Sequence, residues 1–395
     1  MLQYEYFQGV AGTGKSYKLK QLHDENPTDT VLTATTGIAA VNMGEGVTIN
    51  SLLWYYNSSS LLDSWTSGKL DFRLGKVYAE LGIRQILLDE VSMLPASDLT
   101  VLCLALDRLN RQLHLNGKEP IGLTLAGDAA QLPPIEGDYF FTSEHWKEKF
   151  EPNTTILRHI YRQSDEDFIQ ALGWVRKGEG KKAAEFFEPL MNKLIDPHLE
   201  GTTLYPYNAA VDRHNAYRLE RVKGTKIEFE ARKNGKQRPE WKNIPDLLQL
   251  KEGALVMILA NRSVAGDLVY CNGDLGTLIA KKDDTAVVEL QRGGTVDVQY
   301  ILREYEDNVD GKKKVVGSVL YMPIRLAYGS TIHKAQGLTL DNVQVDFRAD
   351  FYTKTPGMLY VALSRARSVK GLRLCGGPKT FVKHCKMNKK IERFL

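Results

Sequence analysis

The chain has 395 residues, of which 43% are hydrophobic and 25% charged, an ordinary balance for a protein of two or three folded domains. A formal net charge of +4 allows nucleic-acid binding without requiring it. We expect no membrane span and no signal peptide, since no apolar run is long enough for a bilayer. The cysteines lack metal-ligand spacing, which indicates free thiols in a reducing compartment. They are Cys103, Cys271, Cys375 and Cys385.

A glycine-rich stretch at residues 9–16 reads GVAGTGKS, the spacing of a phosphate-binding loop. It lies between a predicted strand at 2–7 and a predicted helix at 17–22, where such a loop belongs; a chance glycine-rich turn is the alternative. Lys15 is expected to reach the β- and γ-phosphates of a nucleotide, and the Ser16 hydroxyl to ligate Mg²⁺. The expected cradle is Gly9, Ala11, Gly12, Thr13, Gly14, Lys15 and Ser16.

Two turns rich in small residues follow. Thr35 and Thr36 come after a predicted strand at 30–34, and a similar turn covers 48–53. Their hydroxyl and backbone groups suit either a phosphodiester contact or a simple helix cap. The aromatic residues at 54–56 suit either base stacking or, more commonly, a hydrophobic core.

Carboxylates and an amide follow the next two predicted strands. The strand at 85–88 ends at Asp89 and Glu90, and the strand at 121–126 precedes Gln131. After a phosphate-binding loop this pattern predicts that Asp89 holds Mg²⁺ and that Glu90 orients and deprotonates the attacking water. Gln131 is placed to hydrogen-bond the γ-phosphate. Without that context, the acidic pair is an ordinary helix start and Gln131 belongs to a proline-rich turn.

In the second half of the chain the amino-acid composition and the hydrophobic pattern change twice. Residues 223–243 are polar and basic, which predicts a long exposed loop. From 254 to 320, short alternating segments separated by turns predict a small β-barrel or sheet module. Helical and parallel-strand patterning returns at 323, and 379–395 is expected to form a short strand and a helix.

An ATP site also needs positive charge for the transition state, and the motifs in the first 150 residues supply no arginine for it. Arg162, Arg365 and Arg367 are candidates from far along the chain. An arginine supplied by another domain makes hydrolysis depend on closure of a cleft, which is how a nucleotide drives motion.

Together these stretches resemble the motifs of superfamily 1B helicases, in the branch of PIF (petite integration frequency), RecD-like and Dda-like DNA helicases. The resemblance covers almost the whole chain in the right order. The matching segments are 9–16 (motif I), 33–40 (Ia), 89–93 (II), 127–134 (III), 161–163 (IV), 329–341 (V), 360–367 (VI) and 272–276, a turn of the inserted barrel.

The resemblance implies an α/β fold with two RecA-like parallel-sheet domains. The first would cover 1–150, with a small wedge subdomain at about 54–82. The second would cover 151–249 and 322–395, interrupted by an SH3-like β-barrel at 250–321.

The resemblance also implies ATP and Mg²⁺ as cofactors, single-stranded and forked duplex DNA as partners, and a monomeric 5′ to 3′ motor. It implies a cytoplasmic location in a bacterial or phage-infected cell, or a nuclear or mitochondrial one in a eukaryote. Arg162 and Arg365 would be the two arginine fingers, with Gln336 and Gly337 facing the nucleotide. The expected catalytic set is Lys15, Glu90, Gln131, Arg162 and Arg365, and the expected DNA contacts are Thr35, Thr36, Thr48, Asn50, Thr331, His333 and Lys334.

Two departures from the family pattern stand out. Family members usually carry an adenine-reading glutamine on a helix ahead of the first strand, and none precedes Leu2 here, so base selectivity is not implied. Asn50 stands where relatives often have histidine.

Three other activities compete with unwinding: a DNA-stimulated translocase, a nucleotide-gated DNA clamp and a small-molecule kinase. The kinase does not explain Arg365 or the segment 331–337.

Overall fold

In a computed structural model the chain divides into two compact units, Met1–Glu200 with Leu204–Pro206 and Thr331–Leu395, and Gly201–Thr203 with Tyr207–Ser330. The structure describes residues 3–43, 46–192, 194–196, 199–237, 241, 244–260, 262–264, 267–270, 273–309 and 312–395. Cys271 and Asn272 therefore lie outside the described residues. No helix among those described is both long and apolar enough to cross a bilayer.

The first unit is built on a six-stranded sheet of order β3-β2-β4-β5-β1-β6, in which every neighbouring pair is parallel. Its strands are β1 (Tyr4–Gly9), β2 (Thr30–Ala34), β3 (Val47–Thr48), β4 (Gln85–Asp89), β5 (Gly122–Gly127) and β6 (Thr154–Leu157). Strand β4 is buried throughout, as a strand covered on both faces must be.

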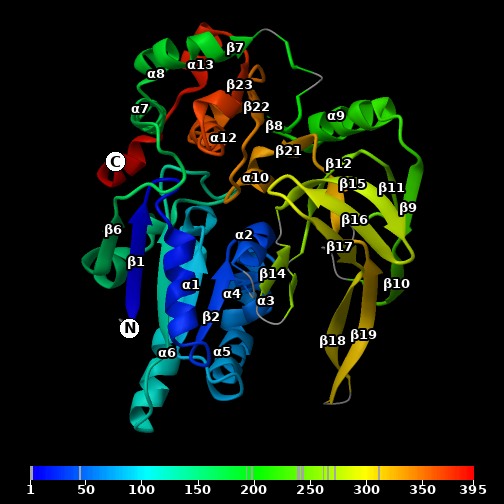
Figure 1. Ribbon diagram of the computed structural model, residues 1–395. Coiled ribbons are helices and arrows are strands. Elements are labelled where there is room, and N and C mark those ends of the chain that lie inside the picture. The colour runs from blue at the N-terminus through cyan, green and yellow to red at the C-terminus, as the bar shows by residue number, and fades with distance from the viewer. Residues whose placement is uncertain are drawn as a thin grey trace. The chain divides into compact units, whose positions relative to one another are not determined.

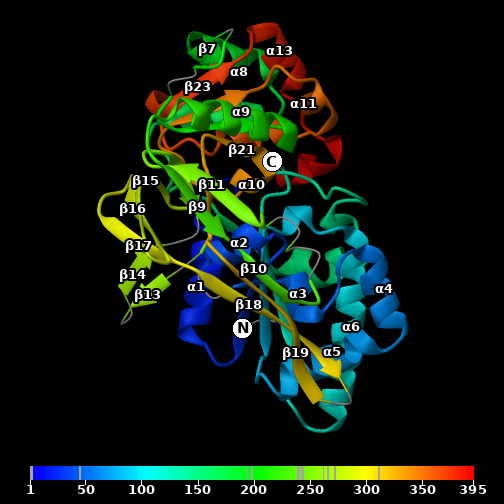
Figure 2. The same ribbon diagram turned by 90° about the vertical axis from the view of Figure 1, so that its right-hand side faces the viewer.

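Helices α1 (Lys15–Glu25) and α2 (Gly37–Asn42) pack against this sheet (Figure 1), where Leu19 joins Phe7, Leu32 and Leu87 in one apolar cluster. Figure 2 shows α4 (Ser58–Thr66), α5 (Lys69–Ala79) and α6 (Ala96–Leu115) packed together. The short α3 (Ile49–Leu53) precedes them. The polar stretch at 57–69 therefore contains a helix, with Leu61 buried against its neighbours.

A second sheet has the order β21-β8-β22-β23-β7, with bounds β7 (Met191–Asn192), β8 (Thr202–Tyr205), β21 (Gly329–Thr331), β22 (Val343–Asp346) and β23 (Leu372–Cys375). Strands β22, β23 and β7 are parallel neighbours. The helices of this part are α7 (Glu166–Arg176), α8 (Gly180–Phe187), α10 (Ile332–Ala335), α11 (Phe351–Lys354), α12 (Met358–Leu363) and α13 (Pro378–His384). Two parallel-sheet α/β cores, of the RecA-like kind, are thus present.

In the second unit, helix α9 (Asn208–Arg221) is followed by strands between residues 226 and 326 that pair antiparallel. Its largest sheet has the order β17-β16-β15-β12-β20, and smaller sheets pair β10-β19-β18, β11-β9 and β13-β14. The bounds are β9 (Lys226–Glu230), β10 (Arg232–Gly235), β11 (Leu247–Lys251), β12 (Leu255–Ile258), β13 (Arg262–Val264), β14 (Asp267–Tyr270), β15 (Leu275–Lys282), β16 (Thr285–Leu290), β17 (Thr295–Gln299), β18 (Ile301–Val309), β19 (Lys312–Tyr321) and β20 (Ile324–Leu326).

Two sequence predictions were wrong. Residues 223–243 were expected to form a loop, but β9 and β10 lie there, because Ile227 and Phe229 alternate with polar residues and enter the core of the second unit. The segment 379–395 contains no strand; it continues α13 and ends in a 3₁₀ helix, η8 (Lys389–Phe394). The predicted domain boundaries stay predictions.

Candidate functional site

The strand order places the predicted chemistry at one edge of the first sheet. Strands β1, β4 and β5 are parallel, and β5 lies between the other two. The carboxyl ends of parallel strands meet at one edge. The loop at 9–16, the acidic pair at the end of β4 and the loop containing Gln131 therefore lie together.

The phosphate-binding loop turns through two glycines in the left-handed region, Gly12 (φ 87°) and Gly14 (φ 79°), a conformation that glycine adopts without a steric penalty. Lys15 is buried, and its Nζ donates to the carbonyls of Gly9 (2.9 Å) and Val10 (3.0 Å). Burial lowers the pKa of Lys15, while the carboxylates of the site act in the opposite direction. The ammonium therefore sits inside the loop, where a polyphosphate would offer it stronger partners.

The two predicted metal ligands lie in direct contact, since Ser16 Oγ donates to Asp89 Oδ2. Burial, and then the charge of Glu90, raise the pKa of Asp89. A buried carboxylate beside a second one and a hydroxyl fits a divalent cation. No group of three His, Cys, Asp or Glu side chains suited to a metal occurs among the described residues. Mg²⁺ commonly binds one or two protein oxygens and takes its other ligands from phosphates and water, so this pair fits.

Glu90, Gln131 and Gln336 form a buried cluster. Gln336 Nε2 donates both to Glu90 Oε2 (3.0 Å) and to Gln131 Oε1 (3.1 Å). Gln336 Oε1 is buried and has no hydrogen-bond partner among the described residues. Glu90 itself adopts left-handed backbone angles, φ 54° and ψ 42°, which are unusual for a residue with a side chain. The sequence did not predict that Gln336 bridges the other two side chains.

Arg162 lies against the phosphate-binding loop. A Cβ added to Gly12 would come within 2.7 Å of Arg162 Cβ, and the neighbouring Tyr161 N–H donates to Gly12 O (2.8 Å). The guanidinium of Arg162 donates to Thr339 Oγ1 (2.9 Å) and to the carbonyls of Ser364 (3.1 Å) and Gly337 (3.3 Å). Burial, and then the charge of Arg365, lower the pKa of Arg162 to about 9.

Arg365 is almost fully buried, at 1% exposure. It donates to the carbonyls of Val361 (2.9 Å) and Leu338 (3.3 Å) and to Ser364 Oγ (2.9 Å). Burial lowers its pKa, while the charge of Glu90 acts in the opposite direction. The two predicted fingers thus share the neighbourhood of the site, although Arg365 is held by carbonyl groups. Arg367, by contrast, is exposed and pairs with Asp341 (2.7 Å).

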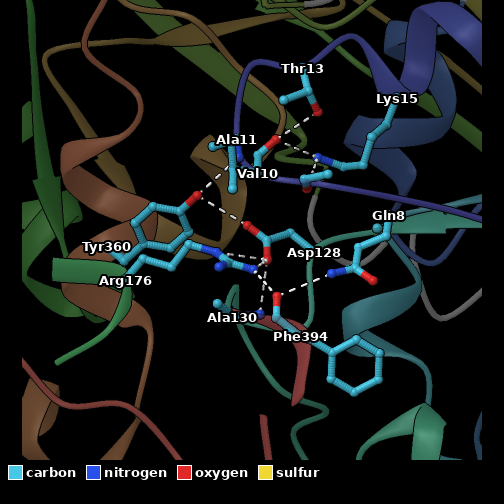
Figure 3. A network of polar contacts seen from close by, with 12 residues as sticks. Gln8, Val10, Ala11, Thr13, Lys15, Asp128, Ala130, Arg176, Tyr360 and Phe394 are labelled. Carbon is cyan, nitrogen blue, oxygen red and sulfur yellow. Dashed lines mark hydrogen bonds and ion pairs between the residues drawn. The ribbon is translucent and has the colours of Figure 1, made fainter. Parts of the chain in front are cut away.

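A network beneath the loop was not predicted (Figure 3). Ala11 N–H donates to the Tyr360 hydroxyl (2.9 Å), which donates to Asp128 Oδ2 (3.0 Å). Asp128 Oδ1 accepts from Arg176 Nη2 (2.9 Å), and this nitrogen also donates to the carbonyl of Phe394 (2.8 Å). Tyr360 lay in a matched motif but carried no assigned role, and a backbone carbonyl such as that of Phe394 leaves no sequence signal.

Four predicted DNA contacts use their hydroxyls locally. Thr36 Oγ1 accepts from Ala39 N, and Thr48 and Thr331 cap α3 and α10. Thr35 Oγ1 donates to the carbonyl of Glu90 (2.8 Å). The helix-cap alternative therefore describes Thr36 and Thr48, and Thr331 acts as a cap as well. Contact of all four residues with DNA stays a prediction.

The remaining predicted contacts differ in exposure. Asn50 is half-buried and Lys334 is exposed. His333 is half-buried, and burial lowers its pKa. In the aromatic trio at 54–56, Tyr55 is buried, as the core alternative predicts, while Trp54 and Tyr56 are exposed, and base stacking by these two stays a prediction.

Comparison with known proteins gives consistent matches. A family model described as an AAA domain matches residues 2–189. The chain is 31% identical to the ATP-dependent DNA helicase Pif1 of Bdellovibrio bacteriovorus, over 95% of this chain and 85% of that protein. It is 33% identical to the human ATP-dependent DNA helicase PIF1, over 93% of this chain but only 58% of the human one.

Two solved structures extend the likeness to the fold. The Pif1 helicase of Candida albicans gives a TM-score of 0.77 at 28% identity, covering 99% of this chain and 94% of that one. A Bacteroides Pif1 helicase in complex with ADP-AlF3 and single-stranded DNA gives 0.65 at 26% identity, covering 96% and 90%.

Proposed function

Because the chain belongs to the Pif1 family of ATP-dependent DNA helicases, we propose that it couples ATP hydrolysis to 5′ to 3′ translocation on single-stranded DNA and to separation of the duplex ahead. One observation carries this proposal. Arg162 lies against the phosphate-binding loop, and both Arg162 and Arg365 are close enough to Glu90 to feel its charge, although these groups come from distant parts of the chain.

The phosphates would bind in the loop at 9–16, where the amide groups of the turn and the start of α1 favour an anion. Lys15 would exchange its two carbonyl partners for the β- and γ-phosphates, which are stronger acceptors for an ammonium group. Ser16 and Asp89 would hold Mg²⁺, which when bound neutralises phosphate charge.

Glu90 is the proposed base for the attacking water. Gln336 fixes one carboxylate oxygen of Glu90, which leaves the other free to accept a proton from water. Gln131 shares the same amide donor and would contact the γ-phosphate. Arg162 and Arg365 would stabilise the charge that builds on the transferred group, a contribution of about 10³ to 10⁵ in rate for an arginine finger.

Motion would follow from closure between RecA-like domains at 1–150 and 151–395, the latter carrying the 250–321 insertion. DNA would be gripped by the segments 35–36, 48–50 and 331–334, and parted at the wedge, 54–82. The two threonine segments after β2 and β3 start at the same sheet edge as Asp89 and Glu90. Thr35 in particular is bonded to the backbone of Glu90, which links the DNA path to the metal site.

The decisive experiment uses forked DNA with either a 5′ or a 3′ single-stranded tail. We expect ATP-dependent unwinding of the 5′-tailed fork alone, and none from Lys15→Ala. ATP hydrolysis with streptavidin displacement but no unwinding would indicate a translocase and not a helicase. Nucleotide-gated DNA binding with neither streptavidin displacement nor unwinding would indicate a clamp. Hydrolysis indifferent to DNA would favour a kinase-like enzyme. Unwinding by Lys15→Ala would remove the loop from the mechanism.

We further propose that the motor acts as a monomer, in the cytoplasm of a bacterial or phage-infected cell or in the nucleus or mitochondrion of a eukaryotic one. Its relatives come from both bacteria and eukaryotes. Sedimentation of the chain on a forked DNA would test the monomer, since two copies per fork would contradict it.

A further inference from the structure

The phosphate-binding loop is held from two sides by residues next to the two arginines. The N–H of Tyr161, which precedes Arg162, donates to Gly12 O at 2.8 Å. The preceding amide of the loop, Ala11 N–H, donates to the hydroxyl of Tyr360 at 2.9 Å. Tyr360 lies on α12, which ends two residues before Arg365. Each arginine therefore has its own link to the loop.

The hydroxyl of Tyr360 has little freedom to move. It donates to Asp128 Oδ2, and Asp128 is fully buried, with its other oxygen bonded to Arg176 and to Ala130 N. Burial raises the pKa of Tyr360, so its hydroxyl keeps the proton that it donates. A buried polar group that loses its partner is costly. This chain of bonds therefore holds Tyr360 in one position.

The chain of bonds closes on the first strand. The Phe394 carbonyl accepts from Arg176 Nη2 (2.8 Å) and from Gln8 Nε2 (3.1 Å), and Gln8 directly precedes Gly9 of the loop. The Phe394 ring packs on Phe141, with centroids 4.6 Å apart. Figure 3 shows Gln8, Phe394, Arg176, Asp128, Tyr360 and Ala11 in this order. The phosphate-binding loop is thus held at Gln8, just before it begins, and at Ala11, within it.

We propose that Tyr360 is a positioning residue that sets the place of α12, and with it Arg365, against the phosphate-binding loop. Arg365 Nε donates to the carbonyl of Val361 (2.9 Å), the residue after Tyr360. A shift of Tyr360 is therefore passed to the guanidinium within one turn of helix. Asp128, Arg176 and the Phe394 carbonyl support Tyr360. This inference rests on the proposed role of Arg365 in hydrolysis.

The test compares Tyr360→Phe with Tyr352→Phe, a matched control. Both tyrosines are buried in the same unit, and the Tyr352 hydroxyl likewise donates one hydrogen bond, to the carbonyl of Asp346 (2.9 Å). Tyr360→Phe leaves Ala11 N–H and an oxygen of Asp128 without a partner. We expect kcat for DNA-stimulated ATP hydrolysis to fall about tenfold, and the control to keep its kcat.

Two further readouts separate positioning from a structural effect. The affinity for ADP–aluminium fluoride should fall by the same factor as kcat, while the affinity for ADP stays within about twofold. In an Arg365→Ala background, Tyr360→Phe should cause no further loss, because residues that act through one another are not additive.

Equal losses of ADP and ADP–aluminium fluoride affinity would overturn the proposal, as would a full tenfold further loss in the Arg365→Ala background. If Tyr360→Phe folds poorly, Arg176→Lys should give a smaller loss with the same pattern, and a different pattern would count against the proposal. These assays read hydrolysis and binding. A failure to unwind forks would refute the proposed function without altering their outcome.

Discussion

Replacing Gln336 by leucine removes the bridge between Glu90 and Gln131 while nearly keeping the volume. Two hydrogen bonds from Nε2 are lost, at 3.0 and 3.1 Å. A bond to a charged carboxylate contributes about 2 kcal/mol and a neutral one about 1 kcal/mol. If both hold the site in its reactive geometry, about 3 kcal/mol is lost from the transition state. At 1.36 kcal/mol for each factor of ten, kcat should fall about a hundredfold.

The assay is steady-state ATP hydrolysis with saturating single-stranded DNA, together with ADP affinity and Tm. Gln85→Leu is the control, because Gln85 is equally buried and donates to Thr124 Oγ1 (2.8 Å) within the sheet. We expect both variants to lose some Tm, but only Gln336→Leu to lose kcat. A kcat within about threefold of wild type for Gln336→Leu would refute the idea that the bridge orients Glu90.

Three other predictions follow from the geometry. Gly12→Ala should lower kcat, because its φ is 87° and its Cβ would meet Arg162, whereas Gly68→Ala (φ 76°, nothing within 4 Å) should lower only Tm. Arg365→Ala should reduce kcat by orders of magnitude with nucleotide binding intact, and a loss of DNA affinity alone would contradict its role. Burial and a neighbouring arginine lower the pKa of His214 from 6.5 to about 4. The unfolded chain then binds the extra proton between these values, so stability should fall as pH drops from 6.5 to 4. A pH profile of Tm that is the same in His214→Gln would contradict this.

The parallel sheet was predictable because each of its central strands is a short apolar run that ends in a chemically distinctive residue. The strand predicted at 30–34 has the bounds found, and the strand predicted at 85–88 is one residue longer. The β-strands at 226–235 were missed because only Ile227 and Phe229 point to them, amid lysines and glutamates whose side chains face outward. A pattern of two apolar residues is too short to outweigh polar composition.

The contacts of the candidate site also fall into those that the sequence predicts and those that it does not. Contacts inside one motif, such as Lys15 in its loop, follow from local spacing. The contacts of Gln336 and Tyr360 join positions more than 200 residues apart, and no periodicity in one sequence reports such pairs. Arg176 is the last residue of α7, but nothing in the sequence of that helix marks its partner, Asp128. Such pairs arise from packing in three dimensions.

Glu90 sits where a glycine would fold more easily. Its left-handed backbone, φ 54° and ψ 42°, costs a residue with a side chain about 1–3 kcal/mol. Selection for thermal stability alone would therefore favour glycine at this position, because Glu90 lowers the free energy of unfolding. Selecting variants of this enzyme for heat tolerance alone would therefore favour loss of the carboxylate that we propose as the base, so turnover has to be measured alongside Tm.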